Sequence, residues 1–348
     1  MAKKKKKVAV KGPDSVGTKQ RPVHTEILVR PIHRGVNDIG SWRSALRLAD
    51  LGNRTKLYDL FTDLLIDGYL SDAIDKRIDA VTDADLAFTI DGKQVDEMDA
   101  LMDTPEFESL LREIMLSRFW GVSLVECLFL DGFGFKSIPR KHIRTKTKEI
   151  AIREEDEHGI PYADNDLIIQ FGSDDDFGIL LRAAPFVIYK RGGFGDWAQF
   201  VELFGMPQRI GKYSSMDEQS RRALIQAFEE AGSAPYLVIP KETEATQTTL
   251  SSSGNGALYN DFRNACNEEI LITVLGQTMT TQDGSSLAQG QVHMAVQEKK
   301  HRADRRFVER MLNKYFVPLL EKRGYPAGGG RFKFLDKAQE ISVEETVL

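Results

Sequence analysis

Apolar residues along much of this chain recur at spacings of three and four, the period of a helix with one buried face. The pattern predicts helical segments over residues 43–69, 71–82, 106–130 and 287–316. Residues 86–90 instead alternate and end at Asp91-Gly92, a dipeptide typical of a hairpin turn. The stretch 133–171 carries short alternating runs between turn residues. This order of helices and strands predicts a mixed α+β fold.

A further apolar helix, in the middle of the chain, is predicted to end abruptly before residue 205. Its inner face repeats at spacings of three and four, Gly205 stops it and Pro207 prevents it from resuming. The residues of that face are Trp197, Phe200, Val201 and Phe204. The pair Gly192-Gly193 leaves open whether the helix extends upstream of Phe194.

A small strand–helix–strand segment follows this helix. Residues 208–213 alternate like a strand, and Ser215-Met216-Asp217-Glu218 is a capping-box sequence that predicts a helix through Phe228 to Gly232. Tyr236–Pro240 predicts a second strand. A segment this small does not bury a core of its own, so we expect it to pack against copies of itself.

Residues 249–256 are rich in Ser and Gly and predict a linker to the next helix, 258–275. Polar residues then separate that helix from the long one that begins near Leu287. On the long helix the predicted inner face is Val292, Val296, Ala303, Phe307 and Met311. Asp304 is assigned to its solvated faces, together with basic residues and an expected pair between Glu298 and Arg302.

Composition narrows the class of protein to which the chain could belong. With 348 residues, 41% apolar and 28% charged, and a net charge of −5, the chain is typical of a soluble globular protein. No apolar run approaches the length of about 18 residues that a membrane span needs. Cys127 and Cys266, both in apolar stretches expected to be helical, are predicted to be buried thiols. Lys3–Lys7 open a predicted disordered basic arm, 1–20, which is also a possible nucleic-acid contact.

No enzyme signature is present. The sequence lacks a phosphate-binding loop, a His-Glu-x-x-His zinc motif, a Gly-x-Ser-x-Gly elbow and a Cys-x-x-Cys pair. Asp174–Asp176 is favoured as a solvated turn over a metal loop because no spaced set of further oxygen ligands accompanies it. His293 and His301 have no partner at metal-ligand spacing. We therefore predict a non-enzyme with no catalytic residue, metal or cofactor.

The exact amino-acid sequences of two segments are more informative than their periodicity. Residues 196–213 (DWAQFVELFGMPQRIGKY) and 275–281 (LGQTMTT) resemble corresponding segments of the Mu-like family of phage portal proteins, in the same order and at a similar separation. The resemblance covers about residues 100–320. It implies a portal fold with an α+β wing, a helical stem, a small α/β clip and a long helix after a tunnel loop, to which the basic arm is added from composition. The implied divisions are arm 1–20, wing 21–184, stem helix 185–205, clip 206–250, stem helix 256–275, tunnel loop 276–286, long wing helix 287–322 and a short wing or crown segment 323–348.

The resemblance also implies a function. Family members form a ring of about twelve subunits at one capsid vertex, a closed cyclic assembly. Double-stranded DNA is packaged through the ring by the terminase large subunit and later ejected. The implied partners are terminase, the major capsid or scaffold protein and a head-tail adaptor, with no membrane. The implied location is the virion, and the host cytoplasm during assembly.

Candidate site residues follow from these positions. The implied channel constriction is Gln277, Thr278, Thr280, Thr281 and Gln282. The implied terminase-facing residues of the clip are Arg209, Lys212, Arg221 and Arg222, and the candidate DNA-facing residues are Lys299, Lys300 and Arg302. A nearly uncharged constriction suits sliding contacts, because many phosphate contacts would hold DNA tightly in a salt-dependent way. The alternative is a non-enzymatic DNA-binding protein that uses the basic arm and the cationic helix.

Overall fold

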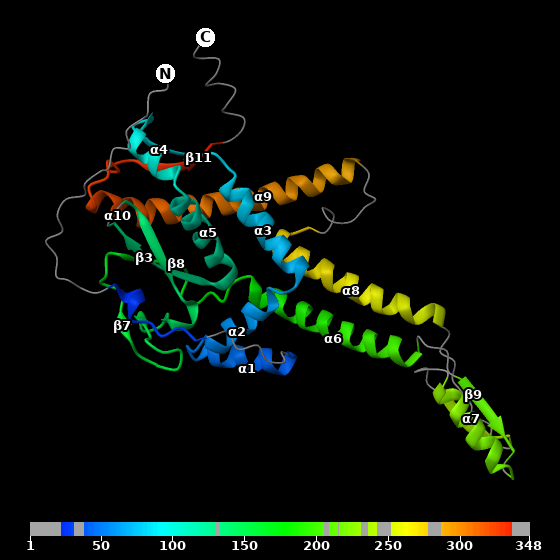
Figure 1. Ribbon diagram of the computed structural model, residues 1–348. Coiled ribbons are helices and arrows are strands. Elements are labelled where there is room, and N and C mark those ends of the chain that lie inside the picture. The colour runs from blue at the N-terminus through cyan, green and yellow to red at the C-terminus, as the bar shows by residue number, and fades with distance from the viewer. Residues whose placement is uncertain are drawn as a thin grey trace, which may run out of the picture. The chain divides into compact units, whose positions relative to one another are not determined.

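The computed structural model describes residues 22–30, 38–129, 132–204, 209–214, 216–230, 236–241, 252–277 and 287–335 (Figure 1). The chain forms two compact units, which we call the large unit (1–187 and 268–348) and the small unit (188–267). Both boundaries fall inside helices, one in α6 (Leu180–Phe204) and the other in α8 (Ser252–Leu275). The predicted basic arm, 1–20, lies outside the described residues.

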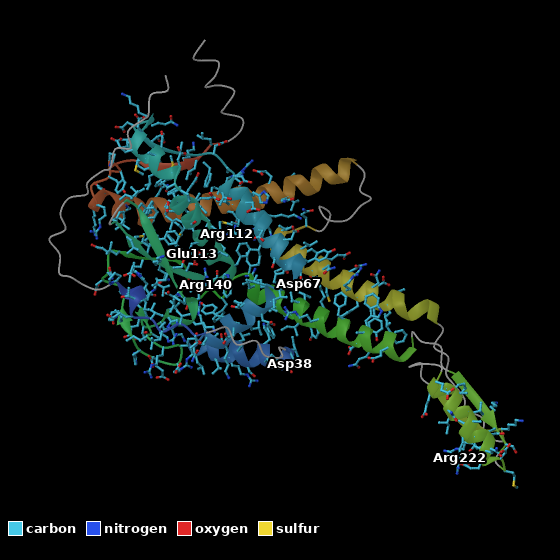
Figure 2. The ribbon with its side chains drawn as sticks, in the orientation of Figure 1. Asp38, Asp67, Arg112, Glu113, Arg140 and Arg222 are labelled. Atoms are coloured by element: carbon cyan, nitrogen blue, oxygen red, sulfur yellow. The ribbon has the colours of Figure 1, made fainter. Side chains whose placement is uncertain are left out.

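The large unit is mainly helical in its first hundred residues and again after α8. Its helices are α1 (Ile39–Asp50), α2 (Thr55–Leu64), α3 (Gly68–Thr82), α4 (Asp96–Met102), α5 (Pro105–Trp120), α9 (Leu287–Met311) and α10 (Val317–Lys322). A π-helical turn, Leu312–Phe316, joins α9 to α10. Aspartates cap α1 and α3: Asp38 accepts from the Ser41 amide at 2.6 Å, and Asp67 accepts from the Leu70 amide at 3.1 Å (Figure 2).

Three small antiparallel sheets complete the large unit. The first has the order β11 (Arg331–Phe334), β1 (Leu86–Ile90), β2 (Lys93–Gln94), and the second has the order β4 (Gly134–Ile138), β3 (Val122–Leu128), β8 (Ile168–Gly172). The third joins β5 (Ile143–Arg144), β6 (Glu149–Ile150) and β7 (Ile160–Pro161). Short 3₁₀ turns lie at Val23–Thr25 and Arg140–His142. The predicted hairpin is confirmed, with φ of +51° at Asp91 and +79° at Gly92.

The prediction of one helix over residues 106–130 is wrong. Helix α5 ends at Trp120, Gly121 takes a φ of +89°, and residues 122–128 form β3 instead. A side chain at Gly121 would collide with the backbone carbonyl of Asp176, so the reversal there requires glycine. Strand β3 is the central strand of its sheet and is buried on both faces, so its sequence lacks the apolar–polar alternation of a half-exposed strand and is not distinguished from a buried helix by periodicity.

Cys127 consequently lies in a strand and not in a helix, although its predicted burial is confirmed. Burial raises the pKa of this thiol to about 12. Cys266, in α8, is also buried.

An aromatic core holds β11 against the helices of the large unit. Phe332 lies 4.9 Å from Phe88 and 5.6 Å from Phe107, measured between ring centroids. Asn313, on the π turn, bonds both backbone groups of Phe332, donating to its carbonyl at 2.9 Å and accepting from its amide at 2.7 Å. Glu309 accepts from the amide of Phe334 at 2.8 Å, so side chains of α9 and the π turn satisfy the outer edge of this strand.

The small unit contains a parallel two-stranded sheet and one short helix. Strand β9 (Arg209–Tyr213) pairs with β10 (Tyr236–Pro240), and α7 (Glu218–Glu230) packs on both. The predicted strands are confirmed, as is the helix between them. Asp217 lies at its amino end and accepts from the Ser220 amide at 3.0 Å; Ser215, the first residue of the predicted capping box, lies outside the described residues.

The outer portions of α6 and α8, residues 188–204 and 252–267, run side by side in the small unit (Figure 1). The rings of Trp197 and Tyr259 stack 6.3 Å apart with an interplanar angle of 5°. A methyl group added at Gly193 would lie 2.8 Å from the ring of Phe262, so glycine there permits the close approach of the helices. Helix α6 is therefore continuous through Gly192-Gly193, which settles the question that the sequence left open.

Helix α8 begins at Ser252, so the prediction of a linker up to residue 256 is wrong. Its Ser and Gly residues are poor helix formers, yet they are incorporated in the first turns of the helix.

Candidate functional site

The candidate site is the junction between α8 and α9. Thr278, Thr280, Thr281 and Gln282 of the predicted constriction lie outside the described residues, so the structure describes only the base of this loop. Helix α8 ends at Leu275, and Gly276 follows with a φ of +81°. The Gly276 amide donates to the carbonyls of Leu271, at 3.2 Å, and Ile272, at 3.0 Å. This left-handed glycine is a common way to terminate a helix.

Cationic side chains bind the carboxyl end of α8. The carbonyl of Val274 accepts from Arg77 Nη1 at 2.9 Å and from Lys300 Nζ at 3.3 Å. Arg77 comes from α3 and Lys300 from α9. Positive groups at this position oppose the partial negative charge of a helix carboxyl end.

Asp304 of α9 holds Arg77 in place. Its carboxylate accepts from Arg77 Nε at 2.8 Å and Nη2 at 2.6 Å, a bidentate pair in which Asp304 is 0% and Arg77 is 2% exposed. Arg118 of α5 donates to the same carboxylate at 2.6 Å. The guanidinium groups also lie over aromatic rings, Arg77 over Phe119 and Arg118 over Phe307. We call Arg77, Arg118, Asp304 and Lys300 the buried charge cluster.

Burial and neighbouring charges act in opposite directions on the pKa values of the basic residues in this cluster. Burial lowers the pKa of Arg118, and the Asp304 carboxylate opposes that shift. Burial also lowers the pKa of Lys300, with nearby Arg77 adding to the effect and Asp304 again opposing it. Burial lowers the pKa of the neighbouring His301 imidazole as well.

The predicted constriction residue Gln277 is the one whose side chain is described. It is 4% exposed, and its amide Nε2 donates to Gln297 Oε1 of α9 at 3.1 Å. The base of the loop is thus bonded to α9 as well as to α3.

The predicted DNA-facing residues have different surroundings. Lys299 and Arg302 are exposed on α9, whereas Lys300 is half-buried and donates to Val274. The expected pairing of Glu298 with Arg302 is replaced by ion pairs from Glu298 to Arg305 and, at 3.9 Å, to His301.

The predicted inner face of α9 is wrong by about one position. Val296 is 40% exposed and Phe307 only half-buried, whereas Asp304, Val308, Leu312 and Phe316 are each 0% exposed. The buried stripe therefore runs at spacings of four through an aspartate, and sequence reasoning assigned that aspartate to solvent. The signal that was available is its spacing of four from Val308, since an acid in register with an apolar stripe needs a buried partner.

The predicted clip residues are surface groups where they are described. Lys212 and Arg222 are exposed, and Arg221 lies 2.8 Å from Glu218, which also lies 3.7 Å from Arg222 (Figure 2 shows Arg222 on α7). Nothing is described of the side chain of Arg209. No residue of α7 is fully buried; Leu224, Ile225 and Phe228 are half-buried.

Other candidate chemistry is structural. Asp174 Oδ1 accepts from Lys148 Nζ at 2.6 Å and from Gln170 at 2.8 Å, and Asp176 accepts from the Gly178 amide at 2.8 Å. Within the described ranges, no group of three or more His, Cys, Asp or Glu residues is placed to hold a metal ion. Nor does any described helix have the length and apolarity of a membrane span.

Known proteins resemble this chain over much of its length. The family model described as the portal protein of Mu bacteriophage matches residues 58–347. The portal protein of Escherichia phage Mu is 29% identical over 140 residues, which are 39% of this chain and 27% of that protein. The Mu-like prophage FluMu protein gp29 of Haemophilus influenzae is 29% identical over 124 residues, 34% of this chain and 24% of that protein. The alignments thus span about a quarter of the length of these relatives.

Among solved structures, an HK97 family phage portal protein from Corynebacterium diphtheriae matches with a TM-score of 0.41 and 16% identity, covering 81% of this chain and 96% of that one. The family expected from segments 196–213 and 275–281 is confirmed by the family model and by the names of the relatives. Because that model covers most of the sequence, the chain belongs to the family of Mu bacteriophage portal proteins.

Proposed function

We propose that this protein is the portal subunit of a phage or prophage. It forms a ring-shaped channel at one capsid vertex, through which terminase packages double-stranded DNA, and through which the DNA is later ejected into a host. The same ring joins head to tail. The observation that carries the proposal is the family match over residues 58–347.

The order of elements fits this role. Helices α6 and α8 frame the strand–helix–strand segment of the small unit, and a loop then leads to α9. We assign α6 and α8 to the stem, β9–α7–β10 to the clip, and residues 276–286 to the tunnel loop. The exposed cations Lys212 and Arg222, the half-buried Arg221, and Arg209 are assigned to the surface that the terminase large subunit meets.

The loop is assigned to the narrowest part of the channel. Its hydroxyl and amide side chains, from Gln277 to Gln282, offer weak polar contacts, which let DNA slide because they release few counterions. The exposed Lys299 and Arg302 are assigned to transient phosphate contacts above or below it. We assign no catalytic residue and no cofactor to the protein.

The remaining partners follow from the position of a portal. A ring of about twelve copies, a closed cyclic assembly, would contact the major capsid or scaffold protein on one side and a head-tail adaptor on the other. The protein would reside in the virion, and in the host cytoplasm during assembly.

The assignment of the tunnel loop is tested by placing bulky side chains in it. Replacing Thr280 and Thr281 together with Trp should leave ring assembly intact and sharply reduce DNA packaging or retention in assembled heads. Gln94→Trp, on the exposed strand β2, is the matched control for a bulky surface change. Normal packaging by the doubly substituted protein would contradict the loop assignment.

A further inference from the structure

The buried charge cluster lies where the chain enters the proposed tunnel loop. Arg77 makes directed hydrogen bonds from three of its nitrogens: Nε and Nη2 donate to Asp304, and Nη1 donates to the carbonyl of Val274. Val274 immediately precedes the last residue of α8, and the loop starts soon after. The guanidinium therefore connects α3, α8 and α9 at one point.

Stability alone does not explain this arrangement. Taking charges out of water is costly, and apolar side chains of similar volume often hold helices together equally well or better. What the rigid guanidinium fork adds is direction, since its donors fix the carboxylate and the carbonyl in one relative geometry. A chain that only needed α3, α5 and α9 to adhere would gain little from a buried Arg–Asp pair.

The charge balance also points to the end of α8. Arg77 and Arg118 donate to the Asp304 carboxylate, and Lys300 lies within electrostatic range of Arg77 and Asp304; outside the cluster, Asp176 is a further carboxylate that acts on Arg118. The excess positive charge faces the carboxyl end of α8, whose partial negative charge offsets it. Lys300 reinforces the contact because it donates to the same Val274 carbonyl as Arg77. The cluster is therefore arranged around that helix end.

The segment that leads from α8 into the loop is held by side chains of α9 on both sides of Gly276. Gln277 bonds to Gln297, and Val274 is bound by Lys300 and, through Arg77, by Asp304. Gly276, between these contacts, has a φ of +81°, which strains any residue other than glycine, and an added methyl group would also require Lys300 Cε, 2.7 Å away, to shift. The place and direction in which the chain leaves α8 are thus set by contacts on each side of Gly276.

We propose that Arg77, held by Asp304 and Arg118, is a positioning residue for the end of α8: it fixes residues 271–277, the segment from which the chain enters the proposed tunnel loop. The inference rests on the proposed portal function, since only there does the loop meet DNA. Arg77 itself touches no DNA in this account and acts through Val274 and the end of α8.

The first test is hydrogen exchange at the end of α8. Arg77→Lys keeps the charge that Asp304 needs but removes the fork that also reaches Val274. Amides of residues 271–277 should then exchange about tenfold faster, because a charged hydrogen bond to the last turn is lost. Arg112→Lys is the matched control, since Arg112 joins the same helices α5 and α3 through an exposed pair with Asp75 at 2.8 Å. Equal exchange in both variants would overturn the proposal.

The second test is DNA passage by the same variants in assembled heads. Arg77→Lys should form rings as the unaltered protein does, yet retain or package severalfold less DNA, while Arg112→Lys should match the unaltered protein. Faster exchange with unchanged DNA retention would overturn the positioning role and leave only a structural contact. If the unaltered protein packages no DNA, the proposed function fails, and the exchange comparison still decides whether Arg77 holds α8.

Discussion

The two units of this chain bury their side chains to very different extents. The large unit encloses rings such as Phe88 and Phe316 and also a charged pair, Arg77 with Asp304, at 0–2% exposure. In the small unit, α7 has no fully buried residue, and its inward-facing Phe228 is only half-buried. A segment of this size has too little interior to exclude water. The difference indicates that the large unit is stabilised by its own core, whereas the small unit needs further cover.

Under the proposed function, that cover is supplied by neighbouring copies in the ring. The expectation drawn from the sequence, that the strand–helix–strand segment packs against copies of itself, therefore stays a prediction. Substitutions matched between the two units sharpen the comparison.

The largest contrast is expected for core phenylalanines. Phe316→Ala removes a ring that is 0% exposed and lies 4.9 Å from Phe133, so it should cost about 3–5 kcal/mol of unfolding free energy. Phe228→Ala, at a half-buried site, should cost roughly 1 kcal/mol in the isolated subunit. Urea denaturation of the monomeric protein measures both. Equal losses would mean that the small unit has a core as complete as that of the large unit.

A contrast of similar origin is expected for aspartates. Asp304→Asn leaves the buried Arg77 and the half-buried Arg118 without their counter-charge and should cost about 3–5 kcal/mol. Asp75→Asn breaks only an exposed pair with Arg112 and should cost at most about 1 kcal/mol. Thermal unfolding separates these cases. A small loss for Asp304→Asn would show that the cluster is better solvated than its burial indicates.

Replacing two glycines of α6 with alanine should change stability by a smaller amount, and in opposite directions. Gly193→Ala places a methyl group 2.8 Å from the Phe262 ring and should destabilise the pairing of α6 and α8 by about 1–3 kcal/mol. Gly195→Ala meets no atom within 4 Å and should stabilise the helix by about 0.5–1 kcal/mol. Fluorescence of Trp197, which stacks on Tyr259, offers a local probe. Stabilisation by both variants would rule out close helix contact at Gly193.

The smallest effect concerns pH. Hydrogen bonds from the Ser220 side chain and amide lower the pKa of Asp217 below its ordinary 3.8, so the folded α7 prefers the ionised cap. Its contribution is present above pH 3.8 and is lost as the pH falls through the lowered pKa. Asp217→Asn should still accept the hydrogen bond at the start of α7 but should abolish this acid dependence. Circular dichroism of the helical signal of the full protein, recorded between about pH 2 and 5, measures the change. Asp38→Asn makes the same change at the amino-terminal cap of α1 and is the matched variant in the large unit.

Local signals in the sequence predicted much of the fold. Asp91-Gly92 determined the hairpin because few residues tolerate a positive φ, and the strands on either side of α7 followed from alternation. The helix predicted over 106–130 was wrong because β3 is buried on both faces, so its pattern has no strand period. The first turns of α8 were missed because Ser and Gly have low helix propensity and predict a linker.

The candidate site was predictable only in outline. The motif at 275–281 predicts the break between α8, which ends at Leu275, and α9, which begins at Leu287, while the role of the intervening residues as a tunnel loop stays a prediction. The partners of Asp304 were not predictable, since Arg77 and Arg118 are separated from it by 227 and 186 residues. Periodicity reports which face of α9 is apolar, but it contains no information on which helix packs there. The buried aspartate was therefore read as a surface charge.

The most direct test of the central claim is the mass and symmetry of the purified protein, measured by native mass spectrometry together with negative-stain imaging. The account predicts closed rings of about twelve subunits around a central hole, with weak affinity for DNA. A stable dimer that binds duplex DNA in a salt-sensitive way would contradict it and favour the DNA-binding alternative.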